Sequence, residues 1–116
     1  MRVQCSTVDD FITNLRAELP SAIVSKVVYV SQVERSLDSG DPRQATRFTV
    51  YVQASCVVDL EDGGQYLLEM AVNCGLDYRD ATNEREGTSE AARVRQKLTE
   101  CCDDLGLRIR PGVLDV

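Results

Sequence analysis

The residues with the widest chemical repertoire in this chain are its cysteines, Cys5, Cys56, Cys74, Cys101 and Cys102. No two of them form a C-x-x-C pair, and an odd number cannot close a disulfide framework. The chain has no histidine, so it lacks the commonest general base, the commonest zinc ligand and the usual partner of a nucleophilic thiol. We therefore expect five free thiols with no catalytic or zinc-binding role.

Carboxylates form the second group that could do chemistry, because paired acids serve acid–base catalysis or hold a hard cation. They fall in small clusters, at Asp38 and Asp41, at Asp59, Glu61 and Asp62, at Asp77 and Asp80, and at Asp103 and Asp104. None matches a calcium-binding loop, and each lies in an expected turn or helix end, where aspartate is favoured for conformational reasons. Asp77 and Asp80 are the best candidates if any ion binds. We expect no catalytic, cofactor or metal site and no small-molecule ligand.

Charge and glycine patterns also argue against binding of phosphate groups. No G-x-x-x-x-G-K or G-x-G-x-x-G motif is present, and Gly63-Gly64 is a turn signal. The net charge of −6 disfavours nucleic-acid binding, since that binding depends on neutralising phosphates. The basic cluster Arg93, Arg95 and Lys97 lies near Glu90 and Glu100 on an expected helix, which is typical of a solvated face with local ion pairs. The acidity either keeps the protein soluble or shapes a surface for a basic partner.

Two amphipathic helices are predicted. Over residues 7–19, apolar residues recur at helical spacing, Thr7 can cap the start, and Pro20 ends the helix. Over residues 89–105 the apolar stripe consists of Ala91, Val94, Leu98, Cys101 and Leu105. Thr88 can cap this second helix, residues 79–87 are expected to be a polar connection, and Gly106 suits the left-handed residue after the helix.

Three strands are predicted between the helices, over residues 22–34, 46–60 and 65–78. The last two alternate strictly, with apolar residues at even positions, which is typical of antiparallel strands that bury one face. In residues 22–34 apolar and polar residues do not alternate clearly. We place Val28 and Val30 on the outer face of the sheet. Residues 107–110 form a possible short strand, and Pro111 makes it an edge strand or an extended arm.

The register of the hairpin between the second and third strands follows from parity. The even-numbered apolar residues of both strands must face the same side of the sheet. This requirement excludes a two-residue loop and favours the three-residue loop Glu61-Asp62-Gly63. Leu60 then lies opposite Gly64, with further pairs Val58–Tyr66, Val57–Leu67, Cys56–Leu68 and Arg47–Asp77. This register places Cys56 and Cys74 roughly 20 Å apart along the strands, beyond disulfide reach.

The predicted fold is α+β, a single domain over residues 1–116 with element order α-β-β-β-α and a possible last β. We expect an antiparallel sheet of three or four strands with both helices packed on one face. The other face then carries more apolar side chains than solvation requires, namely Tyr51, Val57, Leu67 and Ala71. These four residues are the candidate interface.

That element order is similar to the order in double-stranded RNA-binding domains, in several small acidic secretion chaperones and in phage tail-completion proteins. An RNA-binding domain of that kind begins its second helix with a basic K-K-x-A-K sequence. The corresponding residues 88–92 here are TSEAA, which argues against RNA binding.

Two functions remain. The first is a non-catalytic, protein-binding or assembly module of the adaptor, chaperone or phage-structural type, which forms homo-oligomers. The alternative is an acidic inhibitor that imitates nucleic acid or blocks a basic channel. A third class of function, an enzyme that uses Asp77 and Asp80, is disfavoured. No apolar run approaches the roughly 20 residues that span a bilayer, and the first residues lack a secretory signal. We therefore expect a cytoplasmic protein with protein partners.

Overall fold

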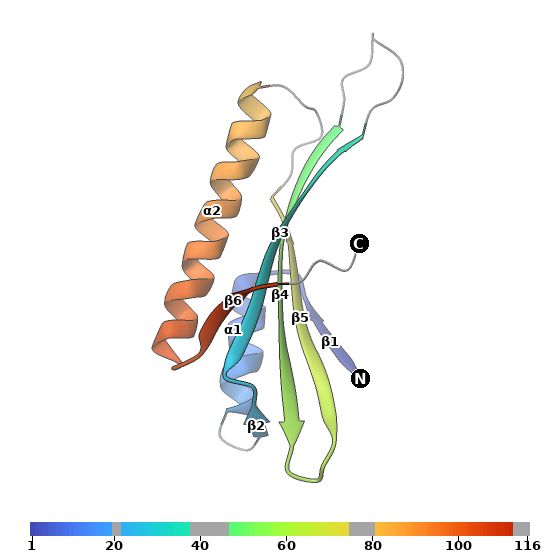
Figure 1. Ribbon diagram of the computed structural model, residues 1–116, viewed down its shortest axis with the longest axis vertical. Helices are drawn as coiled ribbons and strands as arrows, with labels where there is room; N and C mark the ends of the chain where they lie inside the picture. Colours follow the sequence, from blue (N-terminus) through green and yellow to red (C-terminus); the bar gives the residue numbers. More distant parts are fainter. Residues whose placement is uncertain (20–21, 38–46, 75–80, 113–116) are drawn as a thin grey trace.

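A twisted sheet with two helices against one of its faces makes up the described part of the chain (Figure 1). The computed structural model describes residues 1–19, 22–37, 47–74 and 81–112, and side chains are described for 1–19, 25–33, 50–74 and 89–112. The elements in chain order are β1 (Arg2–Cys5), α1 (Val8–Glu18), β2 (Ala22–Val24), β3 (Val27–Leu37), β4 (Arg47–Leu60), β5 (Gln65–Asn73), α2 (Ala81–Asp104) and β6 (Arg108–Pro111).

The sheet is mixed, which corrects the predicted antiparallel sheet of three or four strands. Its six described strands run in the order β1-β5-β4-β3-β6, and β2 pairs with β4 beside β3. The inner pairs are antiparallel, but β1 lies parallel to β5 and β6 lies parallel to β3. The prediction failed at the edges because four-residue strands are too short to show a period. Of the two alternatives given for the segment that contains Pro111, an edge strand or an extended arm, the structure shows an edge strand, since β6 pairs with β3 alone.

The hairpin of β4 and β5 has the predicted register. Cys56 lies opposite Leu68 and Val57 opposite Leu67. The Leu60 N–H donates to the Gly64 carbonyl at 2.7 Å, and Gly63 has a φ of 89°, which a residue with a Cβ adopts only at a cost. The proposed Arg47–Asp77 pair lies outside the described residues, because the description of β5 ends before Asp77.

The predicted strand over residues 22–34 is interrupted. β2 and β3 both pair with β4, but their registers differ by two residues, and Ser25 and Lys26 form the bulge between them. The Ser25 N–H donates to the Val57 carbonyl at 2.9 Å, and the Lys26 carbonyl accepts from Arg108 N–H at 2.6 Å, where β6 begins. The bulge therefore bends the strand and opens a place for the edge strand.

Residues of β3 face opposite to the prediction. Val28 is fully buried on the helix side and Val30 packs partly against the core, whereas Tyr29 is exposed on the other face. The error arose because valine occurs on both faces of this strand, so apolarity alone could not tell which face is buried. The register against β4 decides it, since Val30 lies opposite the buried Ala54.

The predicted first helix is confirmed and the second is longer than predicted. In α1 the Thr7 side chain accepts from the Asp10 N–H at 3.1 Å, as a capping residue does. α2 begins at Ala81, so residues 81–87 are helical instead of a polar connection, and Thr88 lies inside the helix. At the other end, Leu107 N–H donates to the Cys102 carbonyl around Gly106, whose φ is 72°. This is the glycine-terminated end that was expected.

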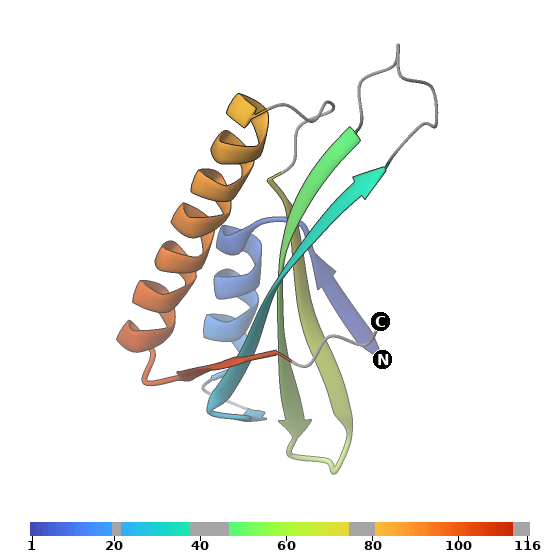
Figure 2. The ribbon, with the colours of Figure 1, turned by 45° about the horizontal axis from the view of Figure 1, so that its top comes forward.

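Both helices pack against the same face of the sheet (Figure 2). Even-numbered residues of β4 and β5 are buried there, and their fully buried partners in the helices include Phe11, Leu15 and Leu98. In α2 the fully buried cysteine is Cys102, not Cys101 as the stripe suggested. One face of the sheet thus holds the core, and the other is left without a covering helix.

We predict that Val52→Asp unfolds the protein whereas Gln53→Asp changes its stability little. Val52 is fully buried, so the substitution would place an unpaired charge in the core, at a cost of several kcal/mol. Gln53 is the next residue and is exposed on the open face. Denaturant unfolding followed by circular dichroism checks both variants. Equal destabilisation would mean that both faces of β4 are buried.

Candidate functional site

The uncovered side of the sheet, which we call the open face, is the candidate functional site. It carries the odd-numbered residues of β3, β4 and β5 and the even-numbered residues of β1 and β6, as the strand registers require. All four residues predicted for the interface lie on it. Val57 is 37% exposed and Ala71 is exposed, while Tyr51 and Leu67 are half-buried. Their placement is as predicted; their role in binding stays a prediction.

A hollow of about 930 Å³ occupies the middle of the open face. Its floor is polar, with Gln53 and Ser55 from β4 and Ser31 from β3. Leu67 and Ala71 line its β5 side, whereas Tyr51 and Val57 lie outside the hollow, toward opposite ends of β4. The structure therefore gathers two of the four predicted residues into one concavity and leaves two on its margins.

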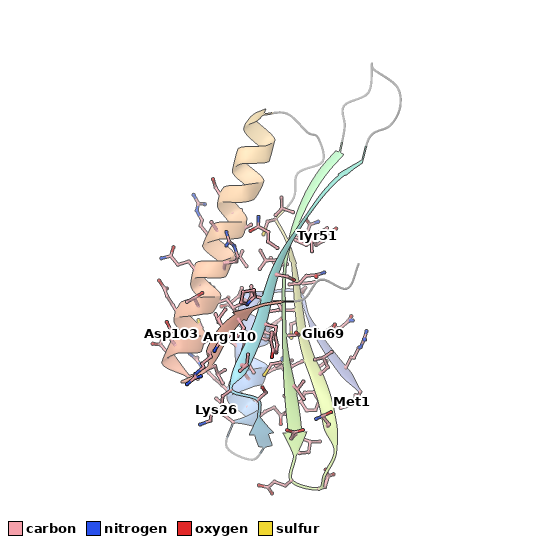
Figure 3. The ribbon with its side chains drawn as sticks, in the orientation of Figure 1. Met1, Lys26, Tyr51, Glu69, Asp103 and Arg110 are labelled. Carbon is pink, nitrogen blue, oxygen red and sulfur yellow. The ribbon has the colours of Figure 1, made fainter. Side chains whose placement is uncertain are left out.

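One row of side chains crosses the whole open face at the hollow. In register, Gln4 of β1 lies beside Glu69 of β5, which lies beside Ser55 of β4. Ser55 lies beside Tyr29 of β3, and Tyr29 lies beside Arg110 of β6. Figure 3 shows Glu69 and Arg110 at about the same height on opposite sides of β3 and β4, with Tyr51 above them. The row thus joins residues that are distant in sequence.

None of the residues in this row was among the predicted interface residues, and Tyr29 is its exposed aromatic member. Its side chain is 46% exposed, the largest exposed fraction among the large apolar side chains inside the described secondary structure. An exposed tyrosine beside an arginine offers both an apolar ring and hydrogen-bonding groups to a partner. The signal that could have revealed it was the register against β4, since Ser55 faces outward by parity and Tyr29 lies opposite it.

Charge on the open face differs from the acidic balance of the chain. It carries Arg2, Arg108 and Arg110 against Asp59 and Glu69. The Arg2 Nε atom lies 3.5 Å from a Glu69 carboxylate oxygen. Within the described ranges, Arg108 and Arg110 have no ion-pair partner. The face therefore presents two unpaired guanidinium groups along its β6 edge, although the whole chain has a net charge of −6.

The helix side carries more of the described acid, interleaved with base. Arg93 pairs with Glu90 at 3.4 Å, as the sequence predicted. Lys97, in contrast, reaches Asp9 of α1 at 2.8 Å, and this hydrogen bond raises the pKa of its ammonium group. Lys97 therefore links the two helices on their solvated side instead of pairing with Glu100. Two of the three basic side chains of this cluster, Arg93 and Lys97, are therefore engaged in ion pairs.

The cysteines contribute to the core. All five are free thiols, as predicted, and Cys101 is the least buried of them. Burial raises the pKa of Cys56 to about 11, and burial together with nearby groups, Cys101 first among them, raises the pKa of Cys102 to about 12. Because the thiolate is the reactive form, these buried thiols are poor nucleophiles near neutral pH.

Metal-binding clusters are absent from the part of the chain that the structure describes, where no three acidic or cysteine side chains gather to hold an ion. The predicted pairs Asp38–Asp41 and Asp77–Asp80 lie outside the described residues. Among the described helices, none is long and apolar enough to cross a membrane.

Comparison with protein-family models, with curated proteins and with solved structures finds no match to this chain. The likeness of element order to RNA-binding domains, secretion chaperones and phage proteins therefore has no support from these comparisons. The correction to the fold weakens that likeness further, because a strand precedes α1 and the sheet is mixed. Function has to follow from the chemistry of the site itself.

We predict that iodoacetamide at pH 8 modifies Cys101 first and Cys56 and Cys102 last in the folded protein. The physical reason is burial, which both hides these two thiols and disfavours their ionised form. Peptide mass spectrometry over time measures the order, and a sample in denaturant, where all thiols should react alike, is the control. Labelling of Cys56 as fast as Cys101 would contradict the buried even face of β4.

The same pKa shifts predict how stability depends on alkaline pH. A thiol whose pKa is higher in the folded than in the unfolded chain stabilises the fold fully below its unfolded pKa of about 9. That contribution is lost as the pH rises toward about 11 and about 12, the folded pKa values of Cys56 and Cys102. Denaturant midpoints measured between pH 8 and 11 should therefore fall, and they should fall less in Cys56→Ala than in the parent. An equal fall in both proteins would exclude Cys56 as a cause.

Proposed function

We propose that this protein is a non-catalytic interaction module that assembles with itself or with another protein through the open face of its sheet. The single observation that carries this proposal is the set of apolar side chains left uncovered there. Tyr29 and Val57 are exposed by 46% and 37%, and Leu67 lies directly opposite Val57. Both helices pack against the opposite face, so no described helix covers these side chains and a second molecule can.

Chemistry at the site supports binding over catalysis. The chain has no histidine, and the cysteine pKa values that shift are all raised, not lowered as in a nucleophile. What the open face offers is an exposed aromatic ring, an aliphatic pair and arginine, the kinds of residue that dominate binding energy in protein interfaces. A homo-oligomer is the simplest assembly with these features.

The acidic-inhibitor alternative receives less support. An imitation of nucleic acid needs a continuous run of negative charge, and the described outer side of α2 interleaves Glu90 and Glu100 with Arg93, Arg95 and Lys97. Asp103 and Asp104 extend the acid only at the end of the helix. Local ion pairing on that side leaves less free charge to attract a basic channel.

We predict that the double variant Val57→Lys, Leu67→Lys abolishes association. Association would then bury two ammonium groups in an apolar contact where neither has an ion-pair or hydrogen-bond partner. The free-energy cost of removing them from water would exceed what the contact contributes. Sedimentation velocity should show the parent as a larger species and the variant as a monomer, with unchanged circular dichroism.

The matched control is Ala17→Lys, Ala92→Lys. It adds the same charge at exposed positions of α1 and α2, and it should sediment like the parent. If the open-face variant keeps the parent's sedimentation coefficient, or if the control dissociates instead, the interface lies on another surface and the proposal is wrong.

A further inference from the structure

Shape limits what can cover the open face. The hollow of about 930 Å³ lies across β1, β5, β4 and β3. Two such faces packed against each other would enclose the space of both hollows, and protein interfaces do not tolerate large unfilled space at their centre. A convex occupant narrow enough to enter the hollow would fill this space, which favours it over symmetric packing of one open face on another.

Charge limits the occupant further. Neither Arg108 nor Arg110 lines the hollow, but Arg110 lies in register beside Tyr29, which does, and Arg108 lies two positions earlier on the same face of β6. Neither arginine has an ion-pair partner among the described residues. The acid within the hollow, Glu69, is already paired with Arg2. An acidic occupant would neutralise the two free guanidinium groups, whereas a basic one would leave them repelled.

Among the described residues, a convex, narrow and acidic segment is the turn between β4 and β5, residues 61–63, which projects at the lower end of the molecule (Figure 1). Glu61 and Asp62 are exposed at its tip. The turn is also rigid, because an Asp62 carboxylate oxygen accepts from the Gly64 N–H at 2.8 Å and Gly63 holds its left-handed conformation. A rigid turn loses little conformational freedom on binding.

A molecule cannot insert this turn into its own hollow. Ser55 lies on the floor of the hollow, and Glu61 is six positions further along the same hairpin, roughly 20 Å away at about 3.4 Å per residue. The strand between them is paired on both sides and cannot fold back. The turn that fills a hollow must come from another copy.

We infer that this protein assembles head to tail, with the acidic β4–β5 turn of one copy seated in the open-face hollow of the next, against Tyr29 and on the side of Arg110 and Arg108 of β6. This rests on the proposed function and adds the identity of the occupant. Because the two contacting surfaces differ, the assembly closes into a ring or continues as a filament. The contact depends on charge, so it weakens as salt is raised from about 0.05 M to about 0.5 M.

The test is an exchange of charge between the two surfaces. The hollow variant is Arg108→Glu, Arg110→Glu, and the turn variant is Glu61→Lys, Asp62→Lys. All four side chains are exposed, so both variants should fold. Each alone brings like charges together, and we expect its dissociation constant to rise at least tenfold. Mixed in equal amounts, the two variants should associate, because every turn then meets a hollow of opposite charge.

The matched control is Asp103→Lys, Asp104→Lys, which changes the charge by the same amount at the exposed end of α2. It should assemble like the parent in sedimentation velocity. Failure of the mixture to associate, or dissociation of the control to the same extent as the turn variant, would overturn the head-to-tail contact.

The two proposals fail in different ways. If the turn variant assembles like the parent while Val57→Lys, Leu67→Lys is monomeric, the open face is the interface but the turn is not its occupant. If all of these variants assemble like the parent, the open face is not the interface, and both proposals are wrong. A parent that stays monomeric and binds an added acidic peptide in the hollow also overturns the head-to-tail contact.

Discussion

The structure depends on the strict alternation of apolar and polar residues along β4 and β5. Because side chains in a strand point alternately to opposite faces, the even residues of both strands gather on one side of the sheet. Both helices pack against that side of the sheet, where Phe11, Leu15 and Leu98 are fully buried. The alternation therefore decides in one step where the core lies and which face is left open. The candidate site is a consequence of how the core is built.

Alternation and parity together predicted the hairpin in detail. Two even-numbered apolar sets that must face the same side allow only odd-length loops, and the glycine at position 63 is the residue that a three-residue loop needs in the left-handed region. The capping residue Thr7 and the terminating Gly106 were predictable for the same kind of reason, since each makes a local backbone interaction. Local rules succeed where the determining residues are close in sequence.

Features decided by distant contacts could not be predicted. The faces of β3 depend on its register against β4 across the bulge at Ser25 and Lys26, and valines on both sides of the strand conceal that register. The parallel edge strands are too short to show a pattern, and their place depends on the helices that precede or follow them. Four residues of the candidate interface were correctly placed on the open face, but Tyr29, Arg108 and Arg110 could be added only once β3 and β6 had been positioned.

The proposal of association through the open face is the central claim, and it rests on an uncovered face, a polar hollow and two arginines that have no ion-pair partner among the described residues. A dilution series followed by methyl resonances tests it most directly. The methyl signals of Val57, Leu67 and Ala71 should shift as the protein is diluted, while those of Leu15 and Leu98 in the core and Ala17 and Ala92 on the helices stay constant. Shifts confined to Ala17 and Ala92, or no shift anywhere across the series, would contradict association through the open face.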